Sequence, residues 1–223
     1  SNGNMYLDSS DYEIMHDGSE QVVGITFPSV DLPPGALMLS ANVLFDVDEV
    51  RPGQSDQDTT VSIYGEANVN SAAPSTTAFD LSSRTATSSA VTWIPEASTA
   101  VHSDLVTPNI ASIVNEITSM PGWAAGNPMT ILFGHVSGSG ARWVESARTN
   151  NNIMTPALMW SSMSCAGGAE ISGAASVTGR PDGAEEDVSN GNMYLDSSDY
   201  EIMHDGGEQV VGITFSGVTV PKD

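Results

Sequence analysis

Apolar and polar residues alternate along much of the chain, and this alternation predicts β-strands. The longest case is Leu37–Val47, in which Ala41, Val43, Phe45 and Val47 fall on one face. Further strands are expected at residues 60–66, 89–94, 129–134, 142–146 and 156–160. Many short strands separated by turn residues are typical of all-β sandwiches. The pattern therefore predicts a mostly β fold, a jelly-roll-type β-sandwich.

One segment has the period of a helix instead. Thr107 and Pro108 open it, and we expect them to be the N-cap and the first helical residue. The apolar residues that follow recur at the spacing of one helical face; they are Ile110, Ile113, Val114 and Ile117. The sequence therefore predicts one short amphipathic helix with this face buried.

The first 27 residues of the chain recur almost unchanged near its end. Ser1–Phe27, which we name head one, returns as Ser189–Phe215, head two, and the copies differ only at Ser19 and Gly207. Protein cores tolerate many apolar exchanges, so packing alone does not require such identity. The spacing of the copies is that of a whole domain with its linker, longer than a solenoid unit. The repeat therefore indicates recent duplication in a tandem array.

Each head has the pattern of a β-hairpin. Glu13–His16 and Glu20–Phe27 flank Asp17-Gly18, a favoured pair for a tight hairpin turn. In the second arm Val23, Ile25 and Phe27 share one face. We therefore expect a repeated β-hairpin head.

The predicted organisation has two heads and a single body. It comprises a β-sandwich module at 1–160, a Ser/Ala/Gly-rich linker at 161–181 and, at 182–223, the head of the next repeat packing on a neighbouring module. If head one completes the body, head two has an uncovered apolar strand, which is a template for pairing with another chain. The expected interface residues are Val22, Val23, Ile25, Phe27, Val210, Val211, Ile213 and Phe215. Two interpretations stay open: a piece cut from a longer array, or strand exchange in a head-to-tail filament.

Charge narrows the classes of partner. The chain has 6 Lys and Arg against 28 Asp and Glu, a formal charge of −22. Nucleic acids and anionic membranes require a basic face, so neither is expected as a partner. No apolar run is long enough to span a membrane. The lone Cys165 has no partner for a disulfide within the chain, which leaves a free thiol or an intermolecular bond.

Clusters of carboxylates raise the possibility of bound calcium, which takes six to eight oxygen ligands. No EF-hand spacing is present, and a solvated acidic rim is the alternative. The candidate metal ligands are Asp8, Asp11, Glu13, Asp46, Asp48, Glu49, Glu185, Glu186, Asp187, Asp196, Asp199 and Glu201.

A second candidate site consists of Arg142, Trp143 and Glu145, because Arg is scarce in this chain. These side chains either contact a sugar or carboxylate, or bridge the structure internally. The tryptophans are sugar-stacking platforms or core residues; they are Trp93, Trp123, Trp143 and Trp160. The chain contains neither a metalloprotease helix motif nor a nucleophile elbow or phosphate loop, so no enzyme is expected.

Short motifs also follow one another in a specific order. They are LPPGA at 32–36, SANVLFDVDEV at 40–50, IYGEA at 63–67, SSRTATSSAVTW at 82–93, TPNIASIVNEI at 107–117, PGWAAGN at 121–127, GARWVES at 140–146, DGAEED at 182–187 and SSDYE at 197–201. As a set they resemble the disaggregatase-related (DNRLRE-type) β-sandwich modules that occur in tandem in secreted and surface proteins. The resemblance covers the chain except the linker. It implies a jelly roll, a secreted location, frequent calcium, and a role in adhesion, glycan contact or scaffolding.

These observations lead to one functional hypothesis and one alternative. The hypothesis is a structural subunit of an extracellular filament or surface array, secreted or on the cell surface and assembled with itself through the repeated terminal β segment. The alternative is a carbohydrate-binding or adhesion module of a larger secreted protein.

Overall fold

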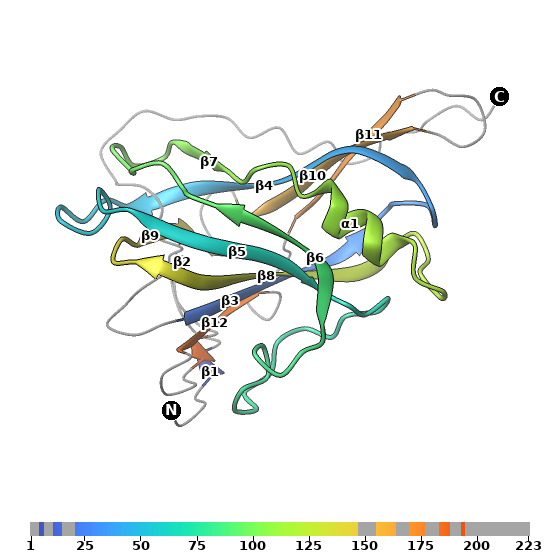
Figure 1. The fold of residues 1–223 in the computed structure, drawn as a ribbon, viewed down its shortest axis with the longest axis horizontal. Helices are drawn as coiled ribbons and strands as arrows, with labels where there is room; N and C mark the ends of the chain where they lie inside the picture. The colour runs from blue at the N-terminus through green and yellow to red at the C-terminus, as the bar shows by residue number, and fades with distance from the viewer. Residues whose placement is uncertain are drawn as a thin grey trace.

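The structure is a computed structural model that describes residues 5–6, 11–14, 21–146, 155–163, 170–176, 183–187 and 193–194. In these residues the protein is mostly β, with two antiparallel sheets that pack face to face and one short helix (Figure 1). The predicted β-sandwich class is confirmed.

The first sheet has the order β1-β12-β3-β8-β5-β6, with β13 also paired to β12. Its strands are β1 (Met5–Tyr6), β12 (Gly183–Asp187), β3 (Gln21–Val30), β8 (Asn127–Gly138), β5 (Thr59–Glu66), β6 (Ala86–Trp93) and β13 (Met193–Tyr194). Segments from both halves of the sequence therefore meet at one edge of this sheet.

The second sheet has the order β11-β10-β4-β9-β2, with β7 paired to β4. Its strands are β11 (Glu170–Ser176), β10 (Ala157–Met163), β4 (Leu37–Glu49), β9 (Arg142–Glu145), β2 (Asp11–Ile14) and β7 (Asp104–Val106). From β2 to β5 the chain changes sheet at every connection, so the two layers are interleaved in sequence.

The core lies between the sheets. The predicted inward face of β4 is buried, and Phe45 is 1% exposed. The ring of Phe45 stacks on Trp93 and meets the edge of Phe133, with ring centroids 6.3 and 5.6 Å apart. Such aromatic pairs add to the hydrophobic stabilisation of burial, and here they join strands of both sheets.

The helix α1 (Ala111–Thr118) covers part of this core. Its predicted apolar residues are all 0% exposed, which confirms the predicted face: Ile110, Ile113, Val114 and Ile117. The predicted N-cap is wrong, because the helix begins after Ile110 and has no side-chain cap. The hydroxyl of Thr107 instead accepts a hydrogen bond of 2.9 Å from the backbone N–H of Val43, so it closes a gap beside β4.

The predicted hairpin of head one is also wrong in its pairing. β2 pairs with β9 in the second sheet, whereas β3 pairs with β8 and β12 in the first. The intervening residues 15–20 lie outside the described part of the chain. Tyr12 and Ile14 from β2, and Ile25 and Phe27 from β3, enter the same core from opposite layers. Separating the two arms allows both apolar faces to be buried.

The stretch expected as a linker is in part a strand. β10 continues to Met163, and β11 pairs with β10 over its whole length. A Cβ at Gly173 would lie only 2.5 Å from the ring of Trp160. The small residues that suggested a linker therefore give β11 room to lie beside a tryptophan.

The outer strand β6 has a side chain that covers part of its backbone. The carboxylate of Glu116 on α1 accepts hydrogen bonds from the backbone N–H groups of Ser88 and Ser89, both 2.7 Å long. These bonds lower the pKa of Glu116 below its ordinary value. Because exposed edge N–H groups promote pairing between molecules, this contact protects the edge.

Glu116→Ala is expected to lower the free energy of unfolding by about 1 kcal/mol at neutral pH, because two charge-assisted bonds are lost at a largely exposed site. The folded pKa lies below the unfolded value, so the stabilisation is present above pH 4.5 and is lost as pH falls through the folded pKa. Urea unfolding at neutral and strongly acidic pH measures both effects. Glu116→Gln, which keeps one acceptor oxygen, should lose less, and an equal deficit for Ala at both pH values would contradict the assignment.

Candidate functional site

Head one is an integral part of the module. Of the expected interface residues in this head, Val22 is 8% exposed, Val23 1%, and Ile25 and Phe27 0%. They lie in this chain's own first sheet, so head one completes the body of its own chain. The corresponding residues Val210, Val211, Ile213 and Phe215 lie outside the described part.

The strand β12 connects this module to head two. It pairs antiparallel with β3, Gly183 opposite Ile25, Ala184 opposite Gly24 and Asp187 opposite Gln21. The chain enters head two directly after β12. The segment 183–187, predicted to belong to the next repeat and pack on a neighbouring module, is therefore part of this module's sheet. Glu185, Glu186 and Asp187, expected as metal ligands, are residues of this strand.

The dipeptide Met-Tyr occurs in both heads, and both copies pair with β12. Met5 lies opposite Glu186 and Tyr6 opposite Glu185. Met193 also lies opposite Glu186, and Tyr194 opposite Glu185. The two heads thus present equivalent residues to the same two positions in the same register. Sequence reasoning identified the repeat but had no signal for this shared pairing.

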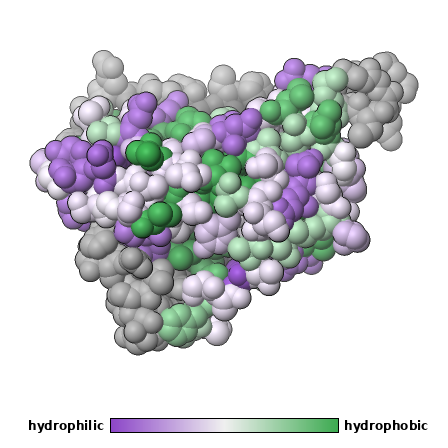
Figure 2. All heavy atoms as spheres, viewed as in Figure 1, coloured by the Kyte–Doolittle hydropathy of each residue, from purple (hydrophilic) through white to green (hydrophobic). Residues whose placement is uncertain are grey.

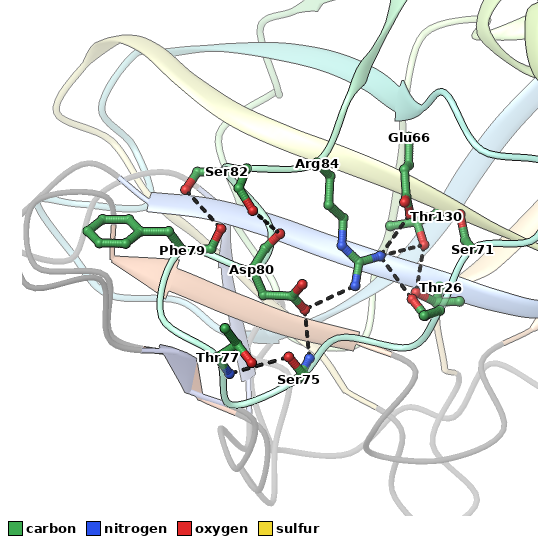
Figure 3. Close-up of polar contacts among 12 residues, drawn as sticks. Thr26, Glu66, Ser71, Ser75, Thr77, Phe79, Asp80, Ser82, Arg84 and Thr130 are labelled. Atoms are coloured by element: carbon green, nitrogen blue, oxygen red, sulfur yellow. Dashed lines mark hydrogen bonds and ion pairs between the residues drawn. The ribbon is translucent and has the colours of Figure 1, made fainter.

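A loop rich in polar contacts lies on the outer side of the first sheet (Figure 3). The guanidinium of Arg84 donates to Glu66 at 2.9 Å, to Asp80 at 3.0 Å and to the carbonyl of Ala72 at 2.9 Å. Leu81 from the same loop lies over Gly24 of β3, where a Cβ would approach it to 2.5 Å. The loop is therefore fastened to the sheet by an ion-pair network and an apolar contact.

Phe79 stands at the outside of this loop and points away from the Arg84 network in Figure 3. Its φ of 61° lies in the left-handed region, which is strained for an aromatic residue. Its exposure is 37%, so the loop holds an aromatic side chain in water. The predicted aromatic platforms behave differently, because Trp93, Trp123, Trp143 and Trp160 are at most 6% exposed and belong to the interior.

Several expected ligand residues meet on the outer side of β2, β9 and β4. Trp143 lies opposite both Glu13 and Glu49, and Asp11 lies opposite Glu145. The indole N–H of Trp143 donates to Glu13 at 2.9 Å. Three of the acidic residues are at least nine-tenths buried; they are Asp11, Glu13 and Glu145. The structure thus brings together residues that the sequence assigned to two separate sites.

Arg51, which sequence reasoning missed, balances part of this negative charge. Its guanidinium lies 4.4 Å from the centre of the Trp143 ring and bonds Glu49 at 2.7 Å. It also lies 3.7 Å from Glu13. A cation over an indole face is attracted by the ring, so Trp143 and the carboxylates hold the same arginine.

No group of three or more potential ligands in the described part of the chain has the geometry to hold a metal ion. Asp46 pairs with His102, Nδ1 to Oδ1 3.4 Å, and burial raises the pKa of this carboxyl. Asp48 is half-buried in β4. The remaining candidates lie outside the described residues: Asp8, Asp196, Asp199 and Glu201.

Arg142 ties loops together at one end of the sandwich. It is 1% exposed, and its guanidinium donates to the carbonyls of Gln57, Pro95 and Glu96 at 3.2, 3.0 and 2.7 Å. Burial lowers its pKa. Figure 2 shows hydrophilic residues gathered over the Arg51–Asp58 loop at the same end. The guanidinium of Arg142 is thus bound internally, as in the structural alternative.

Comparison with known proteins gives no relative. No family model matches the chain, and no curated protein or solved structure does so either. Within the described residues, no helix is long and apolar enough to cross a membrane.

Arg142→Lys is expected to lower the free energy of unfolding by about 2–4 kcal/mol, because an ammonium group cannot reach the separate carbonyls that the planar guanidinium joins. Urea denaturation measures the loss. Arg51→Lys is the matched control, and because Arg51 is partly exposed its loss should stay near about 1 kcal/mol. Equal losses for the two variants would show that Arg142 does not hold the loops.

Proposed function

We propose that this protein is a structural subunit of an extracellular filament or surface array. Its modules are joined head to tail through the repeated terminal β segment. The observation that carries the proposal is the pairing of β12 with β3, since β12 leads directly into head two. Successive modules are thus connected at a sheet edge, which limits their relative rotation more than a flexible linker would.

The role of head one supports the same conclusion. Tyr12 and Ile14 from β2, and Ile25 and Phe27 from β3, supply side chains to the core of this module. Head two contains the same residues at Tyr200, Ile202, Ile213 and Phe215. A second identical set of core side chains requires a second body. In an array, the next module or the next molecule supplies that body.

The acidic composition fits a secreted location but does not identify a ligand. The three best-described arginines are bound within the fold: Arg51, Arg84 and Arg142. The surface therefore keeps most of the charge of −22. Such a surface keeps modules apart except where specific pairing brings them together.

Assembly is expected to depend on head two and the module fold on head one. Because the segments are identical, one substitution can be compared in both. Ile213→Asp should abolish assembly and leave the melting temperature of the module unchanged. Ile25→Asp, at a side chain that is 0% exposed, should unfold the module.

Sedimentation velocity and electron microscopy measure assembly, and circular dichroism measures the fold. Deleting residues 189–223 is the second arm and should give a folded, unassembled chain. Polymers that persist after both changes to head two would refute head-to-tail joining.

A further inference from the structure

The pairing of both Met-Tyr copies with one pair of residues suggests an exchange site. Glu185 and Glu186 pair with Met5–Tyr6 of head one and with Met193–Tyr194 of head two, in one register. β3 pairs along β12 as well, at Gly183, Ala184 and Asp187. A strand has two hydrogen-bonding edges, and β3 takes one of them. The other edge offers full pairing to one further strand at these positions.

Equal sequences give equal pairing energies, so the connecting chain decides which copy binds. Residues 188–192 join β12 to β13 and make a short tether. β1 reaches the same edge only from the other end of the sequence. A short tether gives a high effective concentration, which favours the copy that follows β12.

We propose that the free edge of β12 is the docking site for the head of the following repeat. In this role β1 of the same module is a cap, which covers the edge until the following head displaces it. The inference rests on the head-to-tail assembly proposed above and names its docking strand. The displaced Met5–Tyr6 strand is then available to the β12 strand of the preceding repeat.

The exchange gives every junction in an array the same composition. Each β12 strand has β3 of its own module on one side and the Met-Tyr strand of the next head on the other. A module without a following head keeps its edge covered by its own cap. Because an uncovered edge promotes uncontrolled association, this cap protects the last module.

A disulfide competition in the full chain tests the exchange. Cys165→Ser removes the native thiol, and Met5→Cys, Glu186→Cys and Met193→Cys place one thiol on β12 and one on each copy. Directly opposed residues lie at separations that a disulfide can span. In a glutathione buffer the bonds reach equilibrium, and peptide mass spectrometry gives the ratio of the 186–193 bond to the 5–186 bond.

We expect the 186–193 bond to dominate. Tyr194→Pro removes one donor N–H from β13 and should shift the ratio toward the 5–186 bond by about fivefold, the worth of one net hydrogen bond. Tyr6→Pro is the matched control and should shift the ratio the other way. A ratio that neither proline changes, or a dominant 5–186 bond, would overturn the exchange.

The readout separates this inference from the proposed function. The competition is measured within single chains, isolated as monomers after alkylation. Polymers without competition would refute the cap and leave head-to-tail assembly standing. Competition in chains that never polymerise would refute the assembly, while the exchange on β12 would remain.

Discussion

The fold depends on the burial of one head between two sheets. β2 and β3 are neighbours in sequence, yet they enter opposite layers and fill the space between them with Tyr12, Ile14, Ile25 and Phe27. Removing either strand would uncover the apolar face of the strands beside it, β9 on one layer and β8 on the other. Burial of apolar area is the main favourable term in folding, so the head is a condition for the body. This constraint explains why a duplicated head is more than an appendage.

Alternation and helical period were sufficient to predict the parts whose burial depends on local pattern. The inward face of β4 and the buried face of α1 follow directly from sequence, because each has one apolar side and one polar side. Thr107 shows the limit of such reasoning. A threonine before a proline has the pattern of a cap, but its hydroxyl is used by Val43, which is distant in sequence. Tertiary contacts decide between two local patterns of similar energy.

The errors in the heads and in the supposed linker have one physical origin. A turn pair between two apolar runs is compatible with a hairpin within one sheet and with an arch that crosses between sheets, and only the remaining strands decide. β11 is poor in large apolar residues because Trp160 occupies the space that side chains at Gly173 would need. The candidate sites were affected in the same way. Glu13 and Trp143 were assigned to different sites, yet they share a hydrogen bond across β2 and β9.

The identity of the two heads has a physical explanation if one segment must satisfy two environments. Ile25 and Phe27 are held by the core, which tolerates some exchange of apolar side chains. Met5 and Tyr6 pair with β12, where the backbone supplies the contact and side-chain identity matters less. Neither demand alone requires 27 matched residues with one difference. If a head completes its own body and also docks on the β12 strand of the preceding module, a change that helps one contact is tested against the other at every junction. Duplication supplies the identical copies, and this double use slows their divergence.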